Sequence, residues 1–149
     1  MTSWSRTLIL IDVNVLIYAH RADSPGHAGY HDWLTGVLRK DAPYGMWDLV
    51  SSAFLRIVTH PRIFRSPTPL ETALTFIHEI RDRPHCVLLS PGDRHWEIFT
   101  RISRAVGARG NLIPDAFLAA LAIESGAELI TTDRDYARFP NLRWRHPLA

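Results

Sequence analysis

The segment that most constrains the fold is TLILIDVNVLIYAH, at residues 7–20, in which a short apolar run stops at a carboxylate. Residues 7–11 are nearly all apolar and show no alternation, which is typical of a strand buried on both faces. Such strands occur in parallel sheets that carry helices on both sides. Asp12 then stands at the carboxyl end of the strand, where open α/β sheets bind their ligands. The segment therefore predicts both a sheet and a site.

The rest of the chain alternates short apolar runs with segments of helical period. Apolar runs predict further strands at 44–47, 86–89 and 128–131, and a short fifth at 142–145. Helical spacing, with proline and glycine at the boundaries, predicts helices at 27–38, 49–59, 69–81, 94–106 and 113–125. Because parallel strands need crossover connections, this order predicts a three-layer α/β/α fold with a mainly parallel central sheet of four to five strands.

Length and composition favour one domain spanning residues 1–149. The chain has 149 residues, 46% of them hydrophobic, and shows no internal repeat or long linker. Its single cysteine, Cys86, excludes an intramolecular disulfide framework and lies in an apolar run that indicates core. No stretch approaches the length of a membrane span or a secretory signal, so we expect a cytoplasmic protein without a membrane partner.

Charge permits a nucleic-acid partner without identifying a site. The formal net charge is +2, and Lys40 is the only lysine among 17 basic residues. An excess of arginine favours non-specific attraction to phosphate, but a bias in genomic composition also produces it.

Two further acids are placed to join Asp12. Asp133 directly follows the predicted strand at 128–131, so it reaches the same edge of the sheet if the two strands are parallel neighbours. Asp115 lies in the first turn of a helix, where the helix dipole favours an anion. Clustered carboxylates repel one another unless a cation compensates them, and hard oxygen ligands favour Mg²⁺ or Mn²⁺. The alternative is purely structural, with these acids and Asp135 serving as helix caps and turn residues.

Four motifs in order resemble one family. LIDVNVLIYA, DLVSSAFLRIVTHPRIF, PDAFLAALA and ITTDRDYARFPNL, running from Leu8 to about Trp144, resemble the PIN-domain ribonucleases, and most closely the VapC toxins of VapBC toxin-antitoxin systems. The resemblance implies a compact α/β/α fold and a Mg²⁺- or Mn²⁺-dependent endoribonuclease that cleaves RNA. It also implies a homodimer and neutralisation by a cognate VapB antitoxin.

The same resemblance assigns roles to individual residues. Asp12, Asp115 and Asp133 match the metal-binding, catalytic acids of the family, while Asn14 and Thr132 match polar residues that support them. A glutamate that many relatives carry is missing, because the aligned position is Ser51. Asp48, about one turn earlier, is another acid that could reach the site in its place, as could a water. The number of metal ions stays open.

Contacts to RNA are less defined by the sequence. The arginines in or near the motifs are Arg56, Arg109, Arg134 and Arg138, which either grip phosphate or form surface ion pairs. Trp47, Trp96 and Tyr136 either stack on unpaired bases or belong to the core. His27 and His31 have the spacing of a metal-binding pair on a helix, but no further ligand motif accompanies them, which favours ordinary surface residues.

Three functions fit these observations. The first is the toxin of a type II toxin-antitoxin system acting as a Mg²⁺-dependent endoribonuclease, and the second is a PIN-domain nuclease for RNA processing without an antitoxin. The third is an RNA-binding module that lost catalysis with the glutamate. Apolar helix faces serve either the core alone or also a dimer or antitoxin interface. The basic segment THPRIFRSPTP, at residues 59–69, is expected to be a flexible loop or a plain connection.

Overall fold

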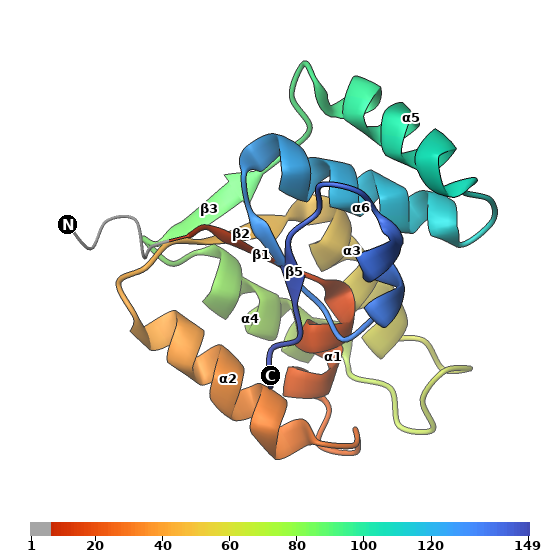
Figure 1. Ribbon diagram of the computed structural model, residues 1–149. Helices are drawn as coiled ribbons and strands as arrows, with labels where there is room; N and C mark the ends of the chain where they lie inside the picture. Colours follow the sequence, from red (N-terminus) through yellow and green to blue (C-terminus); the bar gives the residue numbers. More distant parts are fainter. Residues whose placement is uncertain (1–6) are drawn as a thin grey trace.

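A parallel sheet with helices on both faces organises the chain (Figure 1). This computed structural model describes residues 7–149. Over that range the elements, in chain order, are β1 (Ile9–Ile11), α1 (Val13–His20), α2 (His27–Arg39), β2 (Tyr44–Trp47), α3 (Asp48–Val58), α4 (Leu70–Arg81), β3 (Cys86–Leu89), α5 (His95–Val106), α6 (Leu112–Ser125), β4 (Glu128–Ile130), the 3₁₀ helix η2 (Arg134–Arg138) and β5 (Trp144–Arg145). The three-layer α/β/α prediction is confirmed, and every strand pair is parallel.

The strand order creates a switch point between β1 and β4. In space the strands run β3-β2-β1-β4-β5, so the chain moves outward from β1 to β3 and then returns to the other side of β1. Right-handed crossovers in opposite directions place their helices on opposite faces of a sheet. Figure 1 accordingly shows α5 and α6 above the sheet and α1, α2 and α4 below it. Ligands of such sheets bind where the order reverses, beyond the carboxyl ends of the strands.

Helix α1 was not separated from β1 by the sequence pattern. The apolar run continues from the strand into the helix, and Val15, Leu16 and Ala19 are all buried. The two elements are divided by Asp12, whose carboxylate accepts a hydrogen bond from the backbone N–H of Val13 at 2.7 Å and caps the helix. A buried strand followed at once by a buried helix leaves no change of hydrophobicity to mark the boundary.

Strand β3 differs in burial from its prediction. The strand at Cys86–Leu89 is present, but it lies at the edge of the sheet, and Val87 and Leu88 are 38% and 50% exposed. Cys86 is only partly buried, although its burial raises the pKa of the thiol to about 11. The thiol is therefore protonated at neutral pH and unsuited to act as a nucleophile.

Helix α6 packs closely through its alanines. Ala116, Ala119, Ala120 and Ala122 are fully buried, and small side chains let a helix approach its neighbours. This packing fixes the first turn of α6, and with it Asp115, at the carboxyl end of the sheet. Over residues 7–149, no helix combines the length and the apolar character that crossing a membrane requires.

Candidate active site

The register of β1 and β4 places a hydroxyl beside Asp12. Ile11 pairs with Ile130, so the next residues, Asp12 and Thr131, lie side by side at the sheet edge. The backbone N–H of Asp12 donates to the carbonyl of Ile130 at 3.0 Å, and the Thr131 hydroxyl donates to Asp12 Oδ2 at 2.8 Å. Asp12 is 5% exposed and Thr131 is fully buried. The carboxylate is thus held in one orientation before any ligand arrives.

Asn14 joins the two strand ends a second time. Its side-chain nitrogen donates to Asp12 Oδ2 at 3.2 Å and to the Thr131 hydroxyl at 3.3 Å. Its side-chain oxygen accepts from the backbone N–H of Thr132 at 3.2 Å. Thr132 therefore contributes its backbone, while the hydroxyl that touches the site belongs to Thr131. The sequence reasoning missed Thr131, which counting residues along parallel β1 and β4 would have found.

Asp115 receives a hydrogen bond from a buried tyrosine. Tyr136, in η2, is 3% exposed, and its hydroxyl donates to Asp115 Oδ1 at 3.3 Å. Burial and the neighbouring carboxylates of Asp12 and Asp115 raise the pKa of Tyr136 far above its usual range, so the hydroxyl keeps its proton. Of the two roles considered for Tyr136, the structure supports a core residue that orients an acid, since a buried ring cannot stack on a base.

Asp133 lies where β4 leads into η2. Its carboxylate accepts a hydrogen bond from the backbone N–H of Asp135 at 2.9 Å, and its own N–H donates to the Thr131 hydroxyl at 3.1 Å. Asp135 is exposed and shapes this turn through its backbone. The turn role anticipated for both acids is therefore present, and it leaves Asp133 attached to the same hydroxyl that holds Asp12.

The three acids are near enough to affect one another electrostatically. Burial raises the pKa of Asp12 to about 6, with smaller contributions from Asp115 and Asp133, against hydrogen bonds that lower it. Burial, and next the charge of Asp133, also raise the pKa of Asp115. Mutual repulsion of this kind is relieved when a cation binds between the carboxylates.

A cavity of about 370 Å³ opens at two of these acids, Asp12 and Asp115. Its lining comes from the end of β1 and from α1, β2, α3, α6 and η2, and consists of Asp12, Val13, Trp47, Leu49, Val50, Ser52, Ala53, Arg56, Pro114, Asp115, Leu118 and Tyr136. Its floor is charged and its walls are largely apolar. Trp47 is buried against Phe117, with ring centroids 5.6 Å apart, so it forms part of the wall.

Helix α3 supplies no acid to this cavity. Ser51 is buried, and among residues 7–149 its hydroxyl finds no hydrogen-bond partner, whereas the neighbouring Ser52 is exposed and lines the cavity. Asp48 does not line it, because both carboxylate oxygens bind Arg81 at 2.9 and 3.2 Å. That ion pair holds the pKa of Asp48 below its usual range. Neither Ser51, at the aligned position of the missing glutamate, nor Asp48 therefore lines the cavity.

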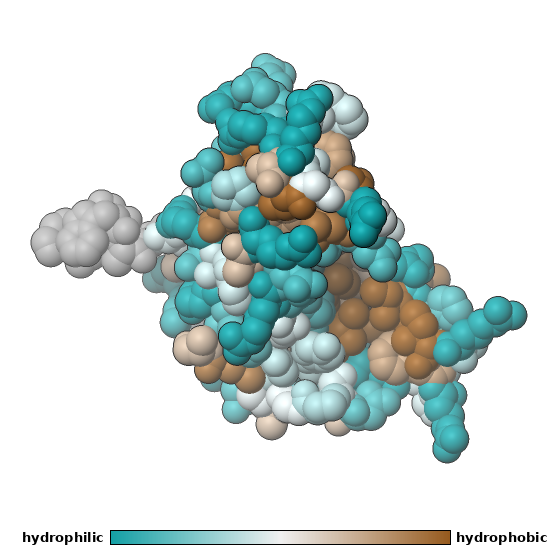
Figure 2. Space-filling view, turned by 45° about the vertical axis from the view of Figure 1, so that its right-hand side comes forward, coloured by the Kyte–Doolittle hydropathy of each residue, from teal (hydrophilic) through white to brown (hydrophobic). Residues whose placement is uncertain are grey.

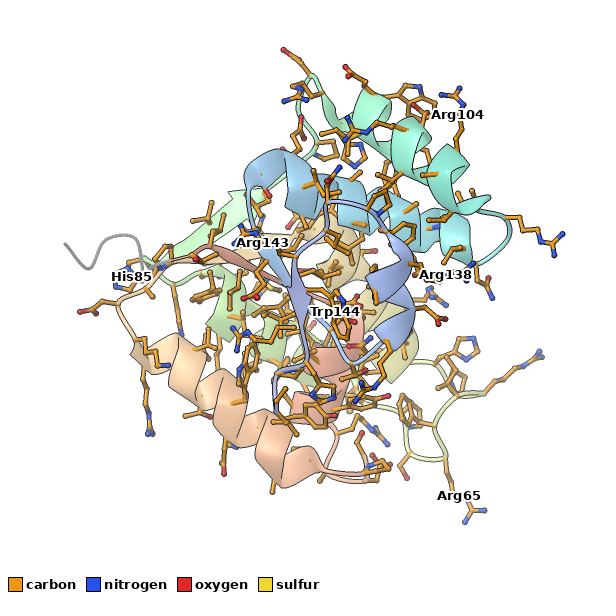
Figure 3. The ribbon with its side chains drawn as sticks, in the orientation of Figure 1. Arg65, His85, Arg104, Arg138, Arg143 and Trp144 are labelled. Carbon is orange, nitrogen blue, oxygen red and sulfur yellow. The ribbon has the colours of Figure 1, made fainter. Side chains whose placement is uncertain are left out.

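Of the four arginines singled out in the sequence, Arg56 lines the cavity. Arg109, Arg134 and Arg138 are exposed, and Figure 3 shows Arg138, the last residue of η2, at the surface. Within the described chain none of the four forms an ion pair, which leaves their charge free. Trp96 is 67% exposed on α5 and lies outside the cavity.

The acids suit a metal ion by their donor atoms, but their side chains are not arranged around one. Across residues 7–149, no group of three His, Cys, Asp or Glu side chains is close enough to hold an ion as the side chains stand. The three acids nonetheless offer carboxylate oxygens, which suit Mg²⁺ or Mn²⁺. His27 and His31 lie on α2 away from this cavity, and His27 Nδ1 binds the carbonyl oxygen of Tyr18 at 2.8 Å.

Comparison with known proteins gives a consistent result. Residues 9–142 match the family model of the PIN domain. Ribonuclease VapC43 of Mycobacterium tuberculosis (strain CDC 1551 / Oshkosh) is 44% identical over 141 residues, covering 95% of this chain and 96% of the relative. Ribonuclease VapC25 of Mycobacterium tuberculosis (strain ATCC 25618 / H37Rv) is 40% identical over 140 residues, covering 94% and 99%.

Solved structures share the fold at lower identity. VapBC2 from Rickettsia felis, bound to a DNA fragment from its promoter, matches with a TM-score of 0.69 and 15% identity over 93% of this chain and 98% of that one. Mycobacterium tuberculosis VapC20, described as a Sarcin-Ricin loop cleaving toxin, matches with a TM-score of 0.64 and 14% identity over 91% and 98%. At such identities the likeness shows the fold alone.

Proposed function

The chain belongs to the PIN-domain family, among the VapC ribonucleases, and on that premise we propose that it is the toxin of a type II toxin-antitoxin system, an endoribonuclease that hydrolyses RNA phosphodiester bonds with Mg²⁺ or Mn²⁺. The observation that carries the proposal is the buried carboxylate of Asp12. It is held by Val13, Asn14 and Thr131, and it lines one cavity together with Asp115. Asp133 binds the same Thr131 hydroxyl through its backbone N–H. We also keep the proposal that residues 1–149 form a single PIN domain.

The acids in and beside the cavity, and the residues that bind them, have different roles in the reaction that we propose. Asp12, Asp115 and Asp133 are the residues that would hold the metal ion. When bound, the ion lowers the pKa of a water and neutralises charge on the phosphate. Thr131 and Asn14 orient Asp12, and Tyr136 orients Asp115. Ligand orientation by such hydrogen bonds strengthens metal sites.

Arg56 supplies the positive charge at the wall of the cavity. Its guanidinium has no acidic partner within residues 7–149 and can bind a phosphate through two parallel hydrogen bonds. A single ion would leave the departing oxygen partly unstabilised, and an arginine at this position is suited to that task.

The partners we propose are a VapB-type antitoxin and a second copy of the chain. Two of the solved structures that share the fold are VapBC complexes, from Rickettsia felis and from nontypeable Haemophilus influenzae. Figure 2 shows an apolar patch on the surface of the molecule, and Leu49 and Ile113, at the starts of α3 and α6, are exposed apolar residues. Such a surface beside an active site suits a helix that docks and blocks it. Because the substrate that we propose is RNA, we also propose that the protein acts in the cytoplasm.

The experiment that tests the proposal is cleavage of total RNA by the wild type and by Asp12→Ala, each with Mg²⁺, with Mn²⁺ and with EDTA. We expect discrete fragments that require metal, and a rate about a thousandfold lower in the variant, because several kcal/mol of transition-state stabilisation are lost with the ion. Asp93→Ala removes an exposed acid outside the cavity and serves as the matched control. Equal cleavage by Asp12→Ala, with circular dichroism showing both proteins folded, would contradict the proposal.

A second candidate is an RNA-binding module without catalysis. Helix α3 brings no acid to the cavity, and the described residues hold no three-ligand group in place, which favours a weak metal site. This candidate predicts RNA binding that EDTA does not change and no cleavage with either metal.

A further inference from the structure

The basic loop, which we define as residues 59–69 between α3 and α4, carries charge that the proposed active site does not use. We propose that it is a second contact for the RNA backbone, separate from the cleavage site, and that Arg21 holds it in position. The inference rests on the proposed function only in that the ligand is RNA. It makes the loop a determinant of which folded RNA is held rather than of the chemistry.

Arg21, at the end of α1, anchors the base of the loop. Its guanidinium is 8% exposed and donates to the carbonyl oxygen of Ser66 at 2.7 Å and to the Thr68 hydroxyl at 3.3 Å. It binds both carboxylate oxygens of Asp23, at 2.9 and 2.6 Å, and lies 4.0 Å from the centroid of the Phe64 ring. A buried guanidinium with all these partners fixes the backbone that it contacts.

The loop also closes on itself. The carbonyl oxygen of His60 accepts from the N–H groups of Ile63 and Phe64, each at 3.2 Å, and His60 Nδ1 accepts from the N–H of Arg62 at 3.0 Å. The N–H of Thr68 donates to the carbonyl of Val58 at 2.7 Å, which brings the two ends together. The segment expected to be flexible is therefore tied down at its base and across its turn.

The tip of the loop presents free positive charge. Arg62 and Arg65 are exposed, the loop contains no acid, and neither arginine forms an ion pair within the described residues. Figure 3 shows Arg65 with its side chain directed away from the body of the molecule. Arg21, in the same region, has its charge fully used. Two unpaired guanidinium groups on a fixed turn are suited to phosphate oxygens, which they bind in a bidentate manner.

The position of the loop fits an RNA that already occupies the cavity. Arg56 lines the cavity in the last turn of α3, and the loop begins at Thr59, directly after that helix. A strand with its phosphate beside Asp12 and Arg56 therefore passes toward the loop. RNA outside the cleaved nucleotides is recognised mainly by shape and phosphate contacts, which this surface can supply.

Binding of a fluorescently labelled stem-loop RNA in EDTA tests the proposal without cleavage. The variant Arg62→Ala/Arg65→Ala is compared with Arg39→Ala/Lys40→Ala, which removes two exposed charges at the amino-terminal edge of the sheet. We expect the loop variant to weaken binding about tenfold and to reduce the slope of log Kd against log salt by about two, since each phosphate contact contributes about one. The control variant keeps the wild-type slope.

A loop variant with the wild-type Kd and salt slope would overturn the proposal. The same holds for a variant that binds the RNA normally but no longer co-purifies with a co-expressed antitoxin, which would assign the loop to a protein partner. The outcome is independent of catalysis, because cleavage of total RNA with Mg²⁺ is measured separately.

A second variant tests the anchor. Arg21→Met is expected to release the loop, so that trypsin cuts after Arg62 and Arg65 faster than in the wild type and RNA affinity falls to the level of the loop variant. Faster cutting with wild-type affinity would show that the position of the loop does not matter, and would overturn the role of Arg21.

Discussion

The side chains on the two sides of the cavity differ in how firmly hydrogen bonds hold them. On the strand side, Asp12, Asn14 and Thr131 share hydrogen bonds and are buried or half-buried. On the helix side, α3 presents Ser52 to the cavity, and Ser51 is buried with an unpaired hydroxyl. The strand side fixes the position of an acid before a ligand binds, while α3 leaves space and brings Arg56 as its charged side chain to the cavity.

This difference assigns metal binding and cleavage to the strand side, and the choice of RNA or antitoxin to the helix side. An acid held on several sides loses little conformational entropy when it binds an ion, because folding has already ordered its side chain. Side chains that make few bonds can change with the RNA or the antitoxin without disturbing that acid. The strand side should therefore be sensitive to small changes and the helix side tolerant of them.

The largest effect is expected from the charge of Asp12. Its pKa is about 6 in the fold against an ordinary value of 3.8, so the folded state binds the proton more tightly than the unfolded chain. In EDTA, the free energy of unfolding should fall by about 3 kcal/mol as the pH rises from below 3.8 through 6. Asp12→Asn, which stays neutral, should lack this loss. Urea unfolding over a pH series measures it.

The exposed Asp93→Asn serves as the control for that series and should follow the wild type. Other acids titrate in the same window, so the difference between wild type and Asp12→Asn is the quantity that counts. A constant difference at all pH values would mean that Asp12 is not held in a costly ionised state, and the contrast between the two sides would lose its main support.

The next effect separates Thr131 from its neighbour. Thr131→Val removes the hydroxyl that donates to Asp12 and accepts from the backbone N–H of Asp133. We expect the free energy of unfolding to fall by about 1–3 kcal/mol. We expect metal-dependent cleavage to fall by about 10- to 100-fold. Thr132→Val keeps the backbone N–H that binds Asn14 and should change either quantity little. Equal losses in both variants would show that shape, rather than the hydroxyl, matters at this edge.

A smaller effect is expected from adding charge to the helix side. Ser52→Glu places a carboxylate on the cavity wall and should tighten Mn²⁺ binding about tenfold, measured by calorimetry, because affinity rises with the number of charged ligands. Ser51→Glu would instead bury an unpaired carboxylate and should unfold at a lower temperature. If Ser51→Glu folded normally and bound the metal better, the assignment of Ser52 to the cavity would be wrong.

The smallest effect is expected at Ser51 itself. Since its buried hydroxyl has no partner among residues 7–149, Ser51→Ala should leave stability within about 0.5 kcal/mol of the wild type or raise it slightly. Cleavage of total RNA should be unchanged. A marked loss of activity would reveal a role for this hydroxyl that the fold does not account for.

The fold was predictable because its signals are local. The strand at Tyr44–Trp47 and the helix at Leu70–Arg81 follow from apolar period and from proline or glycine boundaries, and both are confirmed with bounds shifted by no more than a residue. The exposure of β3 was not predictable, because edge and central strands have similar apolar runs. Such a run does not reveal the order of the strands in the sheet. Helix α1 was hidden for a related reason, since its apolar residues continue those of β1.

The sequence could locate those site residues that a strand end or a motif identifies one at a time. The end of a strand locates Asp12, and the family motifs locate Asp115 and Asp133, although their roles stay proposals. Choosing Thr131 over Thr132 needs the pairing of β1 with β4, and choosing Ser52 over Ser51 needs the rotation of α3 about its axis. Both are relations between distant segments, which a reading along one chain does not contain.

The bonds that hold Asp12 also set an order of assembly. Its partner Thr131 is 119 residues further along, and the bond from Thr132 to Asn14 spans 118. A chain still being synthesised has Asp12 with its near partners Val13 and Asn14 but lacks Thr131 and Thr132, so the centre is incomplete until those residues have been made. A ribonuclease built in this way has no complete active site for most of its own synthesis.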